Sequence, residues 1–261
     1  MSILSQQKQS QAPDFPNIRP SLDLRFALAK KLDPRITFTR GSTGTYFGPD
    51  GIMRTAGVNE PRFDHDPITG QSLGLLVEES RTNSLLRSED FSTTWTLFNS
   101  SVQTNVVSAP DGNTTANYLI ENLVNIEHFA EQNFSATSGT VYTFSAFVKT
   151  DGKKSSAILR LTTTNWSGGV NNNVRFNLST GVGTIVSGSP TYSSQQYPNG
   201  WWRFSITSTA SANGSPTARI QLVQDGGTSQ TYQGNGTSGI YIWGAQVEQG
   251  AFPTSYIPTT A

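Results

Sequence analysis

The chain has 261 residues, enough for one large β domain or two small ones with a hydrophobic core of their own. Its 18 basic and 18 acidic side chains give a formal net charge of +0, so no basic field exists to attract nucleic acid or an anionic membrane surface. Cysteine is absent and histidine occurs only as His65 and His128, which excludes thiol chemistry, disulfides and most zinc sites, and we expect no cofactor.

The first twenty residues differ in composition from the rest of the chain. They contain glutamine, serine and three prolines, at positions 13, 16 and 20. Such a segment buries too little surface to fold alone and favours an extended chain. We therefore predict an attachment arm over residues 1–20 that lies against another chain or domain. No apolar stretch approaches about 18 residues, so we expect neither a signal peptide nor membrane insertion.

Charge density divides the sequence into two regions. Residues 1–90 carry 11 basic and 11 acidic side chains, whereas residues 91–261 carry 7 and 7. We predict a small β module over residues 21–90 and a β domain over residues 91–261.

Short strands are expected within the module. Apolar side chains alternate over residues 22–26 and 36–38, which predicts two strands. Residues 46–52 are typical of a hairpin closed by an Asp-Gly turn. The apolar run 73–77 predicts a buried strand.

Period-two patterns dominate residues 91–261. Apolar residues at 142, 144, 146 and 148 share one face, while Thr143, Ser145 and Lys149 point to the other. The same period recurs over residues 157–161, 174–178, 202–206 and 218–222, with Gly-rich or Asn-rich turns between them.

Residues 240–243 are apolar on both faces, as expected of a central strand or one covered by another segment. Many short strands without βαβ alternation predict an all-β fold, an antiparallel jelly-roll sandwich.

Carboxylates are densest at two places in the module. One contains Asp64 and Asp66, and the other contains Glu78 and Glu79. Glycoside hydrolysis needs two carboxylates about 5–10 Å apart across a cleft. The alternative is that Asp64 and Asp66 flank the turn at Pro67 and pair with arginines such as Arg62 or Arg81, and calcium binding is a third reading. We favour the ion-pair network and predict no catalytic residue and no metal site.

Strand geometry sends the adjacent tryptophans Trp201 and Trp202 in opposite directions. Trp202 is in phase with the apolar residues 204 and 206 and belongs to the core, whereas Trp201 lies on the other face with Arg203. Indole rings stack on sugars and guanidinium groups bind hydroxyl or carboxylate groups. The same phase turns one arginine outward on each of three other strands. The candidate glycan-binding or interface residues are Trp201, Arg203, Arg160, Arg175 and Arg219. Alternatively, these arginines cover a solvated face and the N-terminal module or a neighbouring subunit covers Trp201.

Several longer motifs carry a family resemblance. In the first part of the chain they are LDPRITFTR (32–40), NEPRFD (59–64), GLLVEESRTN (74–83) and SEDF (88–91). Later in the chain they are PNGWWR (198–203), IYIWGAQVE (240–248) and FPTSYIP (252–258). Over roughly residues 32 to 258 the chain resembles tailed-phage virion proteins of the head spike fibre or tail fibre type. Their jelly-roll half resembles carbohydrate-binding modules.

The resemblance implies a non-enzymatic structural component of a bacteriophage virion, at the particle surface. It implies a homotrimer that is anchored to other virion proteins, of the capsid or the tail, through residues 1–90. Two alternatives stay open, a tail-fibre-type adhesin that recognises a host surface glycan and, more remotely, a capsule-degrading glycosidase.

Overall fold

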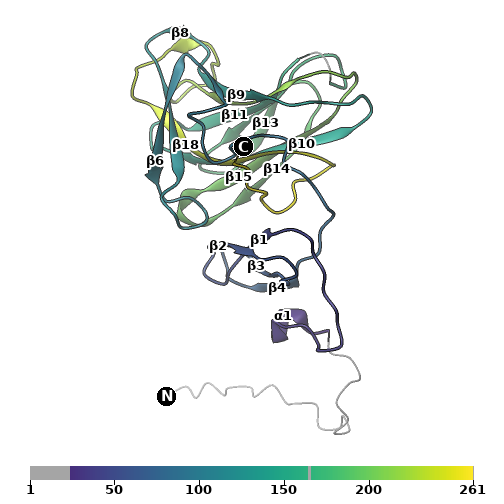
Figure 1. Cartoon of the computed structure of the whole chain (residues 1–261). Coiled ribbons are helices and arrows are strands. Elements are labelled where there is room, and N and C mark those ends of the chain that lie inside the picture. The colour runs from purple at the N-terminus through teal and green to yellow at the C-terminus, as the bar shows by residue number, and fades with distance from the viewer. Residues whose placement is uncertain (1–23, 164–165, 261) are drawn as a thin grey trace, which may run out of the picture.

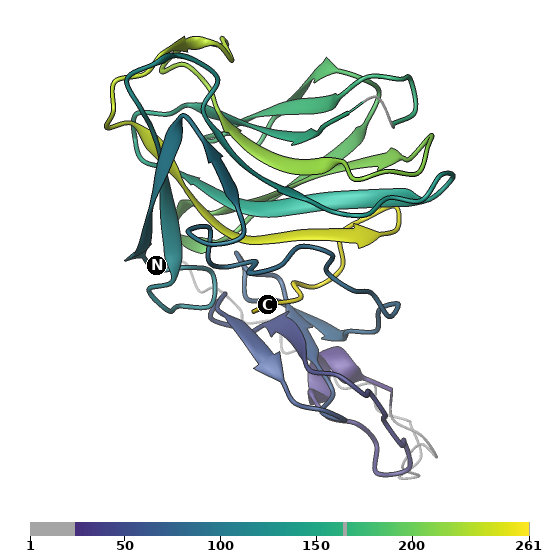
Figure 2. The same ribbon diagram turned by 45° about the horizontal axis from the view of Figure 1, so that its top comes forward.

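The computed structural model describes residues 24–163 and 166–260. The arm predicted over residues 1–20 lies outside the described residues. A β-sandwich makes up most of the described chain, and a small module of short strands lies at one side of it (Figure 1). The C-terminal residues return to the place where the sandwich and the module meet (Figure 2).

Two six-stranded antiparallel sheets form the sandwich. The sheet nearer the module, termed the module-side sheet, has the order β14 (Thr191–Gln196), β15 (Trp202–Thr209), β10 (Val141–Thr150), β18 (Gly239–Gln249), β7 (Ala116–Glu121) and β6 (Ser100–Val107). The other, termed the distal sheet, has the order β13 (Gly183–Ser187), β12 (Asn172–Asn177), β11 (Ser156–Leu161), β16 (Thr217–Leu222), β9 (Phe129–Asn133) and β5 (Thr96–Phe98). This arrangement confirms the predicted antiparallel jelly-roll sandwich.

The main core lies between the two sheets. Its aromatic residues include Phe176 of the distal sheet and Phe204 of the module-side sheet, whose rings stack with centroids 4.3 Å apart. The core residues of the five predicted alternating runs are Tyr142, Phe144, Ala146, Val148, Ala157, Leu159, Leu161, Val174, Phe176, Leu178, Trp202, Phe204, Ile206, Ala218, Ile220 and Leu222. Period-two alternation therefore predicted the buried face of each run correctly.

A second core covers the outer face of the module-side sheet. Phe147 of β10 and Trp243 of β18 point away from the main core, and their ring centroids are 5.4 Å apart. Met53 of the module and Tyr256 of the C-terminal segment pack onto the same cluster. The apolar residues 240–243 thus face a core on each side, which confirms the prediction of a central, covered strand.

The module consists of α1 (Phe26–Ala29) and two antiparallel pairs, β1 (Gly44–Phe47) with β2 (Met53–Ala56), and β3 (Phe63–His65) with β4 (Ser72–Leu75). The first pair confirms the hairpin predicted over residues 46–52. Its turn uses Gly51 at a φ of 72°, a left-handed conformation that glycine adopts without a Cβ clash.

Three expectations for the module were wrong. Residues 26–29 form one helical turn instead of the end of a strand, and this turn stops at Lys30, whose φ is 47°. Residues 36–38 lie outside any strand. The strand at 72–75 exists but is not buried, since Leu73 is 63% exposed. In the described chain β4 pairs only with β3, so one of its edges stays unpaired.

The family motifs meet at the joint between module and sandwich. Asn83 donates from Nδ2 to the carbonyl oxygens of Ala245 and Ile257, both at 3.0 Å. Arg62 pairs with Glu78 at 2.9 Å. Arg62 lies in the motif 59–64, and Glu78 and Asn83 lie in the motif 74–83. Ala245 and Ile257 lie in the motifs 240–248 and 252–258. Their pattern therefore encodes a joint within the chain.

Candidate functional site: the outer face of the distal sheet

Arginines point outward from the distal sheet, as the strand phase predicted. Arg160 of β11 lies directly opposite Arg219 of β16, and its partner on β12 is Asn173. Arg175 follows Asn173 by two positions on β12, and Gln221 follows Arg219 by two positions on β16, so both side chains share this face. We term these five side chains the distal polar face.

Two carboxylates neutralise part of the positive charge. Glu131 of β9 accepts a hydrogen bond from Arg219 Nε at 2.9 Å. Glu127, just before β9, accepts from Arg160 Nη1 at 3.3 Å, from Gln221 Nε2 at 3.2 Å and from Arg219 Nη1 at 3.2 Å. Burial lowers the pKa of Arg160, and the charge of Glu127 opposes that shift. With Arg175, three guanidinium groups face two carboxylates.

Several polar atoms of the distal polar face lack a partner. Within the described residues, Arg160 Nε, Asn173 Oδ1 and Gln221 Oε1 are buried without a hydrogen bond. In the same part of the chain, half-buried Arg175 forms no side-chain hydrogen bond or ion pair. Buried polar atoms are nearly always bonded, because each one left alone costs about 1–3 kcal/mol. This face is therefore suited to donating hydrogen bonds to water or a ligand and to accepting them.

Aromatic rings border the distal polar face. Phe98 of β5 stacks on Phe129 of β9 with centroids 4.8 Å apart and planes 15° from parallel. The guanidinium carbon of Arg219 lies 3.5 Å from the centroid of the Phe129 ring. Phe98 is 39% exposed. An apolar ring surface thus adjoins a dense set of hydrogen-bonding groups.

Two loops, termed the end loops, lie beside this face. One spans residues 122–128 and contains β8 (Asn125–Ile126), and the other spans residues 223–238 and contains β17 (Tyr232–Gln233). The strands β8 and β17 pair with each other. The loops supply Glu127 and also Gln230, which accepts a hydrogen bond from Arg160.

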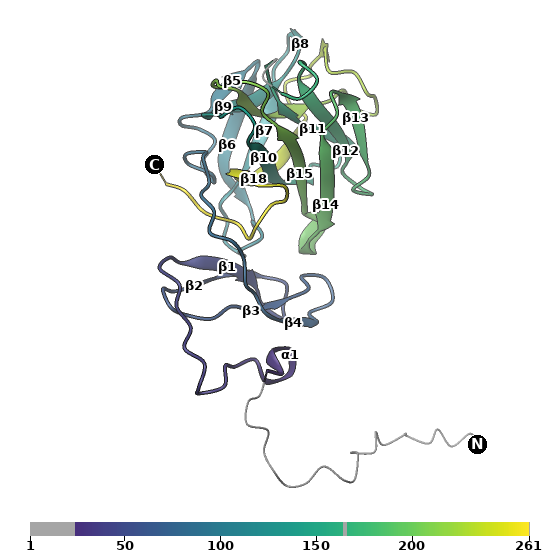
Figure 3. The same cartoon turned by 90° about the vertical axis from the view of Figure 1, so that its right-hand side faces the viewer.

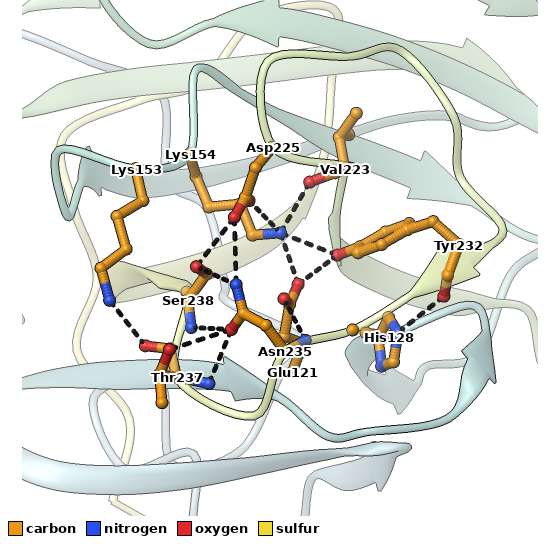
Figure 4. Close-up of polar contacts among 12 residues, drawn as sticks. Glu121, His128, Lys153, Lys154, Val223, Asp225, Tyr232, Asn235, Thr237 and Ser238 are labelled. Carbon is orange, nitrogen blue, oxygen red and sulfur yellow. Dashed lines mark hydrogen bonds and ion pairs between the residues drawn. The ribbon is translucent and has the colours of Figure 1, made fainter.

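A buried lysine ties one of the end loops, residues 223–238, to the sandwich. The Lys154 ammonium is fully buried and forms ion pairs with Glu121 and, at 2.6 Å, with Asp225. It also donates to the carbonyl of Val223 at 2.9 Å and to the Tyr232 hydroxyl at 3.0 Å. Figure 4 shows these groups converging on one nitrogen.

The remaining bonds of this network satisfy Glu121. Tyr232 donates its hydroxyl hydrogen to Glu121 at 2.6 Å, and the backbone N–H of Asn235 donates at 2.9 Å. Burial, followed by the hydrogen bond to Glu121, raises the pKa of Tyr232 far above its ordinary value, so the hydroxyl keeps its proton. One ammonium faces two carboxylates in this network, and its contacts fix the loop 223–238 against the sandwich.

Trp201 and Arg203 lie elsewhere, on the outer face of the module-side sheet. Trp201 is 1% exposed and donates from Nε1 to the Ser108 carbonyl at 3.0 Å. Arg203 is also buried and donates to the Thr254 carbonyl at 2.7 Å. The expectation that tryptophan and the arginines share one exposed face is therefore wrong. The module and the C-terminal segment cover Trp201, as the alternative reading held.

Asp64 and Asp66 are engaged within the module. Asp66 accepts the backbone N–H groups of Ile68 at 2.9 Å and Thr69 at 2.7 Å, so it flanks the turn at Pro67 as predicted. Asp64 accepts the backbone N–H of Phe47 at 2.7 Å, and burial raises the pKa of its carboxyl.

The arginine partners differ from those predicted. Arg62 pairs with Glu78 at 2.9 Å, and Arg81 pairs with Glu79 at 2.6 Å. All four line a cleft of about 520 Å³ between the module and the C-terminal segment. Across residues 24–163 and 166–260, no group of three or more histidine or carboxylate side chains could hold a metal ion. No helix in that part of the chain is long and apolar enough to cross a membrane.

Glu127, Phe98 and Phe129 were not anticipated from the sequence. Residues 127, 129 and 131 lie in one period-two phase, so alternation over β9 would have placed Glu127, Phe129 and Glu131 on a common face. Phe98 has no such signal, because β5 has only three residues.

The strands and their connections define the chain as a jelly-roll β-sandwich. No protein-family model matches it, and no curated protein matches it in sequence. Among solved structures it is similar to the enzymatically active domain of tailspike protein 4 of bacteriophage CBA120. The identity is 12% and the TM-score 0.40, over 64% of this chain and 21% of that chain.

Carbohydrate-binding modules are also among the similar structures. The CBM22-1 xylan-binding domain of Xyn10C from Paenibacillus barcinonensis has 11% identity and a TM-score of 0.38, over 66% of this chain and 97% of that chain. The CBM22-1 and GH10 modules of Xyn10B from Clostridium thermocellum have 14% identity and a TM-score of 0.38, over 69% of this chain and 29% of that chain. Similarities this low assign no ligand or activity to this chain.

Proposed function

We propose that this chain binds a glycan on the distal polar face. The observation that carries the proposal is the set of unpartnered polar atoms on Arg160, Asn173 and Gln221, beside the exposed ring of Phe98. A sugar offers hydroxyl groups that donate and accept hydrogen bonds, and C–H faces that pack on aromatic rings. The hydroxyl groups would bond the unpartnered polar atoms of this face, and the C–H face would cover the exposed Phe98 ring.

The position of the face supports an adhesin over a purely structural role. The distal sheet lies on the far side of the sandwich from the module (Figure 3). A chain held through its module would keep the distal polar face turned toward its surroundings. The second core, in contrast, is closed by the chain itself.

We further propose that the chain is a non-enzymatic virion component. It attaches as a homotrimer to other virion proteins through residues 1–90, as the motif resemblance implies. The engagement of Asp64, Asp66, Glu78 and Glu79 within the chain supports a role without hydrolysis. Deleting residues 1–20 should abolish incorporation into particles. Full incorporation, a monomer in light scattering, or product release from a polysaccharide would each contradict part of this proposal.

Affinity electrophoresis of the full chain tests the glycan site. Gels contain neutral and acidic polysaccharides, among them β-glucan and polygalacturonate. Arg175→Ala should weaken the retardation about tenfold, the value of one hydrogen bond to a charged group, and Phe98→Ala should also weaken it. Arg54→Ala is the matched control, because Arg54 is an exposed arginine of the module. No retardation in any gel, or retardation that survives both changes, would contradict the proposal.

A further inference from the structure

Glu127 holds an unusual position on the distal polar face. Its carboxylate is shared among Arg160, Arg219 and Gln221, and all three bonds are 3.2–3.3 Å long. Charge-assisted bonds of this kind are ordinarily about 2.7–2.9 Å. The bond from Glu131 to Arg219, at 2.9 Å, has the ordinary length. Glu127 is therefore the weakly held carboxylate of the pair.

The side chain of Glu127 can also rotate away from Arg160, Arg219 and Gln221. Its side chain is 28% exposed, compared with 19% for Glu131. The contacts with Arg160, Arg219 and Gln221 come from its side-chain oxygens, so a rotamer change releases them without moving β8 or β9. The Lys154 network holds the loop 223–238, the β8–β17 pair joins the loop 122–128 to it, and neither tie uses the Glu127 side chain.

Cations on the face exceed what Glu127 and Glu131 can neutralise. Arg175 forms no ion pair in the described part of the chain, and Arg160 Nε has no acceptor there. If Glu127 rotates away, three guanidinium groups remain against Glu131. Guanidinium groups form paired hydrogen bonds with planar carboxylates, so an incoming carboxylate fits the vacated place.

We infer that Glu127 occupies the position of a ligand carboxylate, and that the glycan bound here is acidic, built from uronic acids. This inference rests on the proposed glycan function. The sugar carboxylate displaces Glu127 from Arg160 and Arg219, Arg175 holds a second acidic or hydroxyl group, and the sugar ring packs against Phe98. Without ligand, Glu127 thus neutralises part of the charge of the neighbouring Arg160 and Arg219.

Matched polysaccharides provide the test. The full chain is titrated with polygalacturonate, alginate and hyaluronan, and with the carboxyl-reduced form of each, which is neutral but otherwise alike. Wild type should bind at least one acidic form about tenfold more tightly than its reduced form, as expected for one additional charged hydrogen bond. Glu127→Gln should strengthen binding of the acidic form and leave the reduced form unchanged. Arg219→Gln, which removes one of the two guanidinium groups that would hold the sugar carboxylate, should remove most of the preference.

The control is Glu79→Gln, which makes the same change of charge at an exposed carboxylate of the module. It should leave both affinities as in wild type, and this separates a local effect from a change in net charge. Equal affinity for acidic and reduced forms, or Glu127→Gln weakening the acidic form, overturns this inference and leaves glycan binding standing. If neither the acidic and reduced forms nor the neutral polysaccharides bind, the proposed function fails and this inference with it.

Discussion

Replacing Lys154 by methionine should destabilise the fold by about 3 kcal/mol, the lower end of the cost of breaking a buried ion pair. The variant loses the ion pairs to Glu121 and Asp225 and two further hydrogen bonds. Glu121, which is 2% exposed, is then left in the interior with only the Tyr232 hydroxyl and one backbone N–H as partners among the described residues. Asp225 is partly exposed, so water takes over its share and the cost stays near the lower end.

Urea denaturation and thermal unfolding measure this loss. For a chain of this size, 3 kcal/mol lowers Tm by roughly 6–12 °C. Lys153→Met is the matched control, because the neighbouring ammonium is exposed and its nearest acceptor, the Thr237 carbonyl, lies at 3.5 Å. It should change stability by less than about 0.5 kcal/mol. Adding Glu121→Met to Lys154→Met should recover stability, since no buried charge then remains. A loss below about 1 kcal/mol, or a double variant weaker than the single one, would refute the reasoning.

Two further predictions concern other buried groups. Trp201→Ala in the full chain should cost about 3–5 kcal/mol, as much as Trp202→Ala, because both indoles are buried, and calorimetry of the two variants compares them. A negligible loss for Trp201 would mean that the module leaves this face open in solution. Asp151→Asn should be destabilising at neutral pH: burial opposes ionisation of Asp151, but hydrogen bonds from the N–H groups of Lys154 and Gly239 lower its pKa. A lowered carboxyl pKa stabilises the fold fully above the ordinary value of 3.8, and this contribution is lost as the pH falls from there through the lowered pKa, so the difference from wild type should shrink as urea denaturation is repeated at lower pH. A difference that grows on acidification would contradict this assignment.

The alternation of apolar and polar residues predicted most of the sandwich strands correctly. Whether Trp202 or Trp201 faces the main core depends only on strand phase, and the sequence contains that phase. What covers the other face depends on which distant segment returns to it. Here the answer is Tyr256 and Met53, and no pattern around Trp201 specifies either of them. The module was harder to predict, because its strands are three or four residues long and its helix is one turn.

The candidate site shows the same division. Outward phase was correct for Arg160, Arg175 and Arg219, but the sequence alone could not separate them from Arg203, because sheet membership follows from long-range pairing. Strand phase also could not predict the burial of Lys154. Its burial depends on Glu121, 33 residues away, and on a loop that follows a different strand. Ion pairs between residues far apart in the sequence produce no local sequence pattern that would predict them.

The joint at the second core also sets an order of events during synthesis. Thr45 donates to the carbonyl of Tyr256 at 2.6 Å, across a separation of 211 residues. Chains emerge from the ribosome at about 5–20 residues per second, so the module waits many seconds for the segment that clamps it. From their own synthesis until Tyr256 emerges, the rings of Phe147 and Trp201 lack part of their cover. A nascent chain of this protein is therefore most prone to aggregate in its last steps of elongation, when the sandwich strands have emerged and the closing segment has not.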